Sequence, residues 1–171
     1  MKPPGHPPPA PTRAYVGIGA NLADPAATVV AAIERLRPWG LVAASGLYRS
    51  APVDAGGPDY INAVAALDTE LEPLALLDVL QAIEAEFGRT RPYHHAPRTL
   101  DLDLLLHGDA VLDTPRLTLP HPRLHQRAFV LRPLLDLAPG LHAPGLGALA
   151  SHLAGTADQA IEALRRPPTM P

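Results

Sequence analysis

The chain has 171 residues, of which 47% are hydrophobic, and a formal net charge of −3. This size and composition suit one globular domain with a substantial core, and the slight negative charge argues against a broad nucleic-acid-binding face. The absence of cysteine and the presence of a single lysine, Lys2, exclude disulfides, thiolate metal sites, iron–sulfur clusters and cysteine nucleophiles, and argue against a P-loop or Schiff-base lysine.

Both ends of the chain are rich in proline. Six of the 22 prolines lie within the first eleven residues and three within the last five, so we expect solvated tails at 1–13 and 167–171 around a single domain at 14–166. The opening residues lack the apolar core of a signal peptide, and no apolar run approaches the ~20 residues of a membrane helix. We therefore expect a cytoplasmic protein without a membrane segment.

In the first half of the body, strand-like apolar runs alternate with helical patterns. Asp24 followed by Pro25 suits the start of a helix, as do Glu72 and Pro73, because proline is favoured at the first helical position. Gly88 marks a helix end. The predicted elements are a strand at 14–20, a helix from Pro25 to about Arg37, strands at 41–49 and 60–69 around a mobile loop at 54–58, and a helix from Pro73 to Phe87.

The second half predicts shorter elements. A proline inside a helical pattern breaks it, so we expect an interruption at Pro133. The predicted elements are a loop at 89–97, a strand at 100–106, a turn with a short strand at 111–117, an interrupted helix from about His125 to Leu137, and closing helices at 146–153 and 158–166. This irregular alternation with short connections predicts an α+β sandwich.

The segment RTLDLDLLLHG puts two aspartates on one face of a strand. Because alternate side chains of a strand share a face, Asp101 and Asp103 are expected about 6.5–7 Å apart, with the leucines directed into the core. Two neighbouring carboxylates repel each other and lose hydration at a buried strand, and a divalent cation relieves both effects. Mg²⁺ typically binds one or two carboxylates together with substrate phosphates. A solvated strand face with two acids is the alternative.

Arginines surround this segment in the sequence. Arg89, Arg91 and Arg98 precede the aspartates, and Arg116 and Arg127 follow them. A carboxylate pair with arginines suits phosphoryl transfer, in which metal and guanidinium groups neutralise the charge on phosphate oxygens. The same groups also suit a metal-dependent nuclease or phosphohydrolase, which stays open as an alternative.

Two other polar patterns have simple structural explanations. Gln81 and Glu84 lie one turn apart on a polar helical strip, which suits a helix surface. His121 and His125 are four residues apart and could chelate zinc if both were helical. Because prolines flank His121 on both sides, we expect it to precede the helix and do not expect zinc.

Several segments occur in an order that resembles one enzyme family. In sequence they are GAN (19–21), LYRSAP (47–52), PDYINAV (58–64), QAIEAEFGRTR (81–91), APRTLDLDLLLHG (96–108) and RLTLPHPRLHQRAFVLRPL (116–134). Together they resemble hydroxymethyl-dihydropterin pyrophosphokinase, an enzyme of folate biosynthesis, over about residues 14–144. The most specific part is PRTLDLDLLL followed by RLTLPHPRL.

The resemblance implies a ferredoxin-like α+β sandwich, with a mainly antiparallel sheet and helices packed on it. It implies 2-amino-4-hydroxy-6-hydroxymethyldihydropteridine diphosphokinase activity, in which pyrophosphate passes from ATP to the hydroxymethyl group of 6-hydroxymethyl-7,8-dihydropterin and AMP is released. ATP would be the co-substrate, and Asp101 and Asp103 would hold two Mg²⁺ ions. We expect a monomer that binds these small molecules and neither nucleic acid nor membrane.

The resemblance also assigns roles to residues by motif. Tyr60 and Phe129 would sandwich the pterin, and Asn62 would hydrogen-bond to its ring edge. The other expected pterin-binding residues are Ser50, Pro52 and Val53. The expected catalytic residues are Arg89 and Arg98, in a mobile loop, with Asp101 and Asp103. The expected nucleotide-binding residues are Gln81, Glu84, Arg91, Leu104, Arg116, Leu117, Thr118, His121 and Arg127.

At four positions the chain departs from the family pattern. His95 stands where the family has an aromatic residue that closes over the pterin, and Ala96 stands where it has glycine. Pro122 replaces an aromatic residue and Ala20 replaces a serine. These departures leave open a second alternative, a non-catalytic nucleotide-binding relative.

Overall fold

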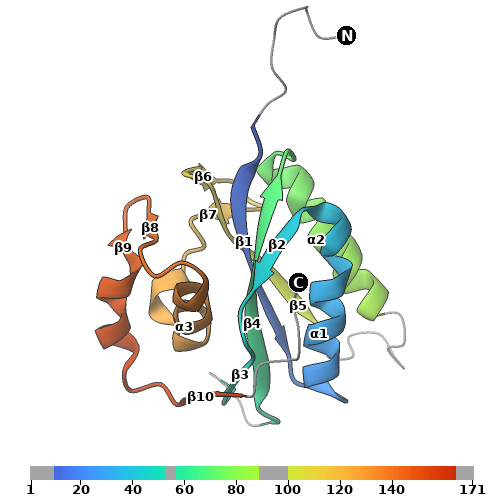
Figure 1. Cartoon of the computed structure of the whole chain (residues 1–171), viewed down its shortest axis with the longest axis vertical. Coiled ribbons are helices and arrows are strands. Elements are labelled where there is room, and N and C mark those ends of the chain that lie inside the picture. The colour runs from blue at the N-terminus through green and yellow to red at the C-terminus, as the bar shows by residue number, and fades with distance from the viewer. Residues whose placement is uncertain (1–9, 53–56, 89–99, 165–171) are drawn as a thin grey trace, which may run out of the picture.

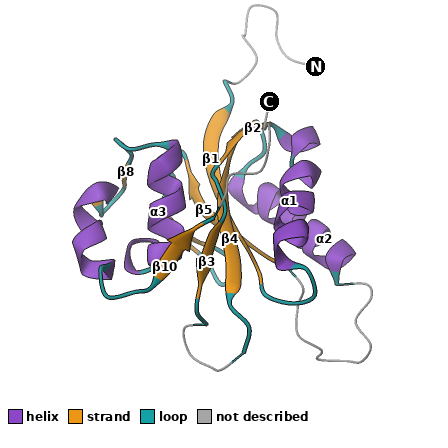
Figure 2. Cartoon of the chain, turned by 60° about the horizontal axis from the view of Figure 1, so that its bottom comes forward, coloured by secondary structure: helices purple, strands orange, loops and turns teal. Residues whose placement is uncertain are grey.

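The computed structural model describes residues 10–52, 57–88 and 100–164. A central sheet lies between helices on both of its faces (Figure 1). Helices α1 (Pro25–Arg35) and α2 (Pro73–Phe87) cover one face, and α3 (Ala128–Leu137) covers the other, as the second view also shows (Figure 2). Asp24 caps α1, where its side chain accepts a hydrogen bond from the Ala27 N–H at 3.1 Å.

The central sheet has the strand order β10–β3–β4–β1–β5, and β2 also pairs with β4. The pairings among these described strands are antiparallel. The strands are β1 (Thr12–Ala20), β2 (Leu41–Ala44), β3 (Tyr48–Ser50), β4 (Tyr60–Thr69), β5 (Asp101–His107) and β10 (Ile161–Ala163). With α1 after β1 and α2 between β4 and β5, the arrangement is ferredoxin-like, and the predicted α+β sandwich is confirmed.

Short elements complete the described part of the chain. Strand β6 (Leu112–Asp113) pairs with β7 (Thr118–Leu119), and β8 (His142–Ala143) pairs with β9 (Gly147–Ala148). Short 3₁₀ helices span Arg37–Trp39 (η1), Leu124–Gln126 (η2) and Leu149–Thr156 (η3).

Hydrophobic side chains pack on both faces of the sheet. Val16 and Ile18 of β1 belong to the core under α1 and α2, together with the buried leucines of α2. Val64 of β4 belongs to the core under α3, with Leu131 and Leu134. Since alternate residues of a strand point to opposite faces, β1, β4 and β5 each contribute to both cores.

The predicted strand at 41–49 is interrupted. Ser45 is buried between β2 and β3, its N–H donates to the Val64 carbonyl at 2.8 Å, and its hydroxyl accepts from the Val64 N–H at 2.9 Å. The side chain thus replaces a ladder hydrogen bond, which divides the segment into two strands along β4.

The predicted closing helices and the break at Pro133 are wrong. Residues 146–153 form β9 and part of η3, and the segment from 158 includes β10, because Ile161 pairs with Ser50 at the edge of the sheet. Helix α3 continues through Pro133, whose missing N–H removes a single bond to the Phe129 carbonyl near the helix start. Most of the predicted loop at 54–58 and all of that at 89–97 lie outside the described residues.

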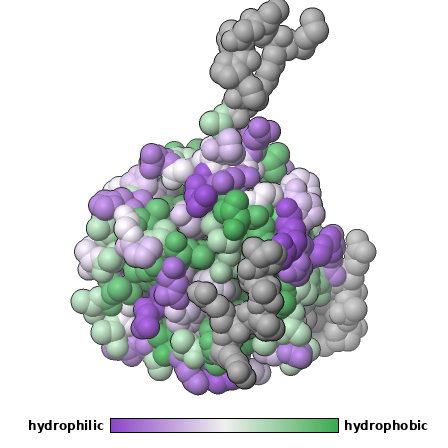
Figure 3. Space-filling model, viewed as in Figure 1, coloured by the Kyte–Doolittle hydropathy of each residue, from purple (hydrophilic) through white to green (hydrophobic). Residues whose placement is uncertain are grey.

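Exposed hydrophobic side chains are distributed over separate elements. In the described ranges, the large ones are Trp39 in η1, Val42 in β2, Leu74 in α2 and Val111 before β6. Hydrophilic and hydrophobic residues are interspersed on the face in Figure 3. Within the described residues, no helix combines the length and apolarity needed to cross a membrane.

The junction between η1 and β2 generates a prediction about stability. Gly40 has φ +98°, and a Cβ there would lie 2.0 Å from the backbone oxygen of Asp68. We expect Gly40→Ala to lower the free energy of unfolding by at least about 2 kcal/mol, because both strain and a backbone clash oppose the side chain. Chemical denaturation measures this change. Gly155→Ala is the control, since its Cβ would contact nothing within 4 Å; equal effects of the two variants would contradict the prediction.

Candidate active site

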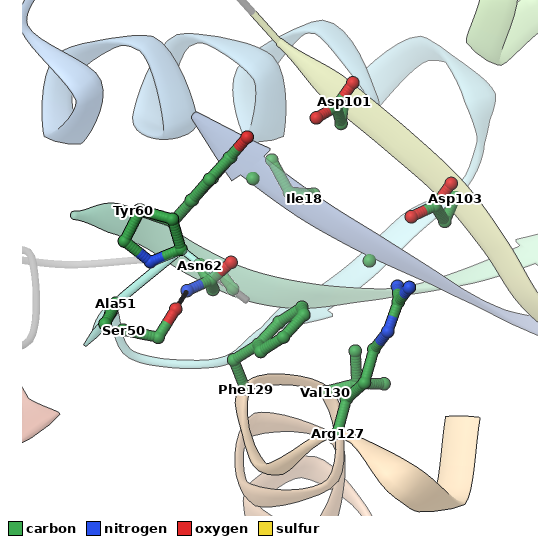
Figure 4. A pocket seen from close by; sticks show the side chains of 14 residues that line it. Ile18, Ser50, Ala51, Tyr60, Asn62, Asp101, Asp103, Arg127, Phe129 and Val130 are labelled. Atoms are coloured by element: carbon green, nitrogen blue, oxygen red, sulfur yellow. Dashed lines mark hydrogen bonds between the residues drawn. The ribbon is translucent and has the colours of Figure 1, made fainter. Parts of the chain in front are cut away.

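A cavity of about 330 Å³ lies on the α3 side of the sheet, beside the start of that helix (Figure 4). Strands β1, β3, β4 and β5 and helix α3 contribute to it. The lining residues are Gly17, Ile18, Gly19, Ser50, Ala51, Pro52, Tyr60, Asn62, Ala63, Asp101, Asp103, Arg127, Phe129 and Val130. Residues far apart in the sequence therefore meet at one site.

Asp101 and Asp103 both line this cavity, as the alternation along β5 predicts. Their neighbours on β1 are Gly19 and Gly17, which have no side chain beside the carboxylates. Asp103 is exposed and Asp101 is partly buried, whereas the leucines that alternate with them are buried in the opposite core. The two carboxylates thus share one accessible face.

A buried hydrogen bond fixes the amide at the floor of the cavity. The Asn62 Nδ2 donates to the Ser50 hydroxyl at 2.8 Å, and the two residues are 4% and 6% exposed. A Cβ on Gly19 would lie 3.3 Å from the Asn62 Oδ1, so this position leaves little space for a side chain. Tyr60 and Pro52 line the cavity beside this pair.

Arg127 and Phe129 reach the cavity from the start of α3. The Arg127 guanidinium carbon lies 5.5 Å from the centre of the Phe129 ring, a distance that suits a cation–π contact. In Figure 4 the guanidinium extends toward β5, the strand that holds Asp103. Among the described residues, the arginines in ion pairs are Arg13, Arg35, Arg37, Arg49 and Arg116. Arg127 thus presents a positive charge without a carboxylate partner in this part of the chain.

Most of the expected nucleotide-binding residues lie outside the cavity, around β5 and its neighbours. Arg116 donates to Asp78 at 2.6 Å and to Gln81 at 3.2 Å, which joins the segment after β6 to α2. Leu104 and Leu117 are buried, and Thr118 is partly buried. Of the expected nucleotide-binding residues that the structure describes, Arg127 alone lines the cavity.

The backbone at the outer edge of β5 is already engaged at two points. The Leu102 N–H donates to the Glu84 carboxylate at 2.8 Å, and the Leu105 carbonyl accepts from the His121 N–H at 3.0 Å. Backbone groups of alternate residues in an edge strand point to the same side, so those of Leu104 point outward like those of Leu102. The Leu105 carbonyl joins them where the pairing with β1 shifts by one residue. An edge of this kind can pair with the polar rim of a planar base.

His121 connects this edge with the carboxylates electrostatically. Burial lowers the pKa of His121, the charge of Asp103 raises it, and the charges of Arg127 and Arg123 lower it further. The His121 Nδ1 also accepts a hydrogen bond from the Arg123 N–H at 3.1 Å, which requires an unprotonated nitrogen. Its buried environment therefore favours the neutral imidazole.

The donor atoms at Asp101 and Asp103 fit a hard divalent cation. Carboxylate oxygens are preferred by Mg²⁺, which usually completes its coordination with water and substrate phosphates. In the described residues no group of three or more His, Cys, Asp or Glu side chains could enclose a metal. Two carboxylates on one strand face are the kind of site at which Mg²⁺ shares its coordination with substrate phosphates.

The expected residues and the residues that line the cavity differ in two ways. Val53, Arg89, Arg91 and Arg98 lie outside the described residues. The missed residues that line the cavity are Gly17, Ile18, Gly19, Ala51, Ala63 and Val130. A signal for the glycines was present, because paired glycines at alternate positions of a strand indicate close approach by another group.

Comparison with known sequences points to one family. Residues 15–139 match the family described as 7,8-dihydro-6-hydroxymethylpterin-pyrophosphokinase (HPPK). The chain is 52% identical over 156 residues to 2-amino-4-hydroxy-6-hydroxymethyldihydropteridine pyrophosphokinase of Pseudomonas aeruginosa, covering 89% of this chain and 96% of that protein. It is 46% identical over 135 residues to the enzyme of the same name from Haemophilus influenzae, covering 77% of this chain and 84% of that protein.

Solved structures share the fold at low sequence identity. A crystal structure of HPPK-DHPS in complex with substrates matches with a TM-score of 0.68 and 12% identity, covering 85% of this chain and 43% of that chain. Wild-type Plasmodium falciparum HPPK-DHPS with pteroate matches with a TM-score of 0.69 and 13% identity, covering 87% of this chain and 43% of that chain. The chain thus spans less than half of these longer proteins.

The charges around His121 generate a prediction that needs no substrate. Asp103→Asn removes a negative charge that raises the pKa of His121, so we expect this pKa to fall further. Arg123→Gln removes a positive charge and should shift it upward. Titration of the imidazole by NMR in the absence of metal and nucleotide measures both shifts. Shifts of the same sign in the two variants would contradict this electrostatic description.

Proposed function

The chain belongs to the 7,8-dihydro-6-hydroxymethylpterin-pyrophosphokinase family, and on this premise we propose how its residues perform the family's reaction. The enzyme transfers pyrophosphate from ATP to the hydroxymethyl group of 6-hydroxymethyl-7,8-dihydropterin, a step of folate biosynthesis that releases AMP. The observation that supports our assignment of roles is the cavity, in which two carboxylates adjoin a compartment with two aromatic rings and a buried amide.

In this proposal the pterin occupies the compartment between β4 and α3. Tyr60 and Phe129 stack on the flat ring, because planar heterocycles gain from contact with aromatic faces. The hydrogen bond from Asn62 to Ser50 holds the amide in one orientation, with Oδ1, which accepts no hydrogen bond from the described residues, able to accept from the ring edge. Pro52 and Val53 complete the pocket in the family pattern.

Asp101 and Asp103 are the proposed ligands of two Mg²⁺ ions. Both are oxygen donors on one accessible strand face, which supports this role. When bound, the ions would screen the negative charge of the triphosphate. The leucines that alternate with the aspartates anchor β5 in the opposite core and keep the carboxylates directed into the cavity.

The nucleotide is proposed to lie along the outer edge of β5. The outward backbone of Leu104 suits the adenine, and Gln81, Glu84, Arg116, Leu117, Thr118 and His121 surround this edge in the family pattern. Arg127 extends into the acceptor cavity itself, so its guanidinium is suited to the phosphates nearest the pterin. Arg91 belongs to the same set by motif.

The proposed reaction is an in-line attack by the pterin hydroxyl oxygen on the β-phosphorus of ATP. A bond forms between this oxygen and the β-phosphorus, and the bond from the β-phosphorus to the oxygen that bridges it to the α-phosphorus breaks. AMP leaves with that oxygen, and the hydroxyl proton passes to solvent water. Arg127 neutralises charge that develops on the phosphate oxygens, with Arg89 and Arg98 in the same role by motif. Stacking and hydrogen bonding orient the acceptor, which makes the attack effectively intramolecular.

We also propose a monomer that acts in the cytoplasm, with residues 14–166 as one catalytic domain. Sedimentation at the concentration used for assays tests this part of the proposal.

AMP release separates this function from the alternatives. We expect AMP only when ATP, Mg²⁺ and 6-hydroxymethyl-7,8-dihydropterin are all present. A phosphohydrolase would release its product without pterin, and a non-catalytic relative would bind ATP without forming AMP. Neither alternative has support in the comparisons.

Removal of one carboxylate tests the metal assignment. We expect Asp103→Ala to lower kcat at least about a thousandfold, because the triphosphate charge is then poorly screened. Asp109→Ala is the control, since Asp109 is an exposed acid just beyond the far end of the same strand. Near-normal turnover of Asp103→Ala with an unchanged Mg²⁺ dependence would contradict the assignment.

Replacement of one aromatic ring tests the acceptor pocket. We expect Phe129→Leu to weaken pterin binding about tenfold or more, since stacking on a ring is worth about 1–3 kcal/mol. Fluorescence titration with the pterin measures the affinity. The chain contains two phenylalanines, and Phe87→Leu, in α2, is the matched control. If both variants bound the pterin equally well, the stacking role would be wrong.

A further inference from the structure

Gln159 makes two hydrogen bonds to the backbone on either side of Arg127. Its Nε2 donates to the Gln126 carbonyl at 2.7 Å, and its Oε1 accepts from the Ala128 N–H at 2.8 Å. Gln159 lies between η3 and β10, and its side chain is partly buried. One carboxamide thus pairs with the two peptide groups that flank a residue of the cavity.

This pairing compensates for an unfavourable residue at the start of α3. Arg127 occupies the N-cap position of that helix, with φ −122° and ψ +115°. Good N-cap residues supply a side-chain oxygen to the first free N–H groups, and a guanidinium only donates. Instead, the Gln159 Oε1 accepts from the N–H of Ala128, the first residue of the helix, and so satisfies one of the free donors of α3 from a distant part of the chain.

The NH₂ group of the same Gln159 carboxamide restrains the turn that precedes Arg127. Its Nε2 donates to the carbonyl of Gln126, the last residue of η2. The carboxamide thus makes one hydrogen bond before Arg127 and one after it, as the backbone of a neighbouring antiparallel strand would. The His125 and His152 rings, 5.1 Å apart and edge to face, join η2 to η3 at a second point. The backbone of Arg127 is therefore held from both sides by the C-terminal segment.

The same segment also contacts the opposite wall of the cavity. Two residues after Gln159, Ile161 of β10 pairs with Ser50, which binds the Asn62 amide. The Leu164 N–H also donates to the Leu47 carbonyl at 2.8 Å. Residues 159–164 thus connect the arginine side of the cavity with its amide side.

We propose that Gln159 is a positioning residue for Arg127. By fixing the extended backbone between η2 and α3, it keeps the guanidinium above the Phe129 ring and directed toward β5. Productive contact between Arg127 and the phosphates of ATP then depends on the Gln159 carboxamide. This inference rests on the phosphate-binding role proposed above for Arg127.

A double-mutant cycle tests this dependence with the full chain. Gln159→Met retains the length of the side chain and removes both hydrogen bonds. We expect it to lower kcat/KM for ATP about tenfold in the wild-type background, because a small displacement of a positioning group has large kinetic effects. In the Arg127→Ala background we expect a further loss of less than about twofold, since the group being positioned is absent.

A matched control and a second variant make the cycle decisive. Ser151→Ala removes a hydrogen bond from the Ser151 hydroxyl, in η3, to the Ala148 carbonyl, in β9, and should leave kcat/KM within about twofold. Gln159→Glu retains the acceptor for the Ala128 N–H and loses the donor to the Gln126 carbonyl. If Gln159→Met does not fold, Gln159→Glu takes its place in the cycle. We expect Gln159→Glu to reduce kcat/KM less than Gln159→Met does.

The outcomes separate this inference from the proposed function. If Arg127→Ala lowers kcat/KM but the Gln159 variant has the same effect in both backgrounds, Gln159 is only structural and the inference is overturned. If Arg127→Ala itself leaves kcat/KM unchanged, the phosphate-binding role of Arg127 fails, and the inference fails with it. A large effect of Gln159→Met that disappears in the Arg127→Ala background supports both.

Discussion

Along β5, aspartates and leucines alternate. The leucine side chains are stable when buried, whereas the aspartate carboxylates need a face that water or ions can reach. The leucines must be buried, so they fix the strand against the core under α1 and α2. The same alternation then directs Asp101 and Asp103 to the other face, where the glycines of β1 leave space. The hydrophobic core thereby determines where the carboxylates lie, and the cavity, the proposed ions and the substrates all depend on this placement.

The other wall of the cavity depends on segments distant in the sequence. Helix α3 begins directly after the arginine that reaches the cavity, and Gln159 accepts a hydrogen bond from the first N–H of that helix. Strand β10 pairs with β3, whose Ser50 orients the amide at the cavity floor. The residues after α3 therefore support the site on two sides, although none of them lines the cavity among the described residues.

Patterns within short stretches of sequence predicted the elements whose position depends on neighbouring residues alone. The strand at 60–69, the helix over Pro73–Phe87 and the shared face of the two aspartates follow from periodicity and helix-start residues. The interrupted strand at Ser45 and the strand β10 arise from hydrogen bonds to β4 and β3, which no local pattern records. The bonds of Gln159 also join segments more than thirty residues apart, so only the folded chain reveals them.

The direct test of the account is the location of metal in a substrate-like complex. Crystals grown with Mn²⁺, 6-hydroxymethyl-7,8-dihydropterin and an ATP analogue with a methylene group between the α- and β-phosphorus would locate the ions by anomalous diffraction. We expect two anomalous peaks, both coordinated by oxygens of Asp101 and Asp103 and by phosphate oxygens of the analogue. Bound analogue with no ion at these carboxylates would contradict it.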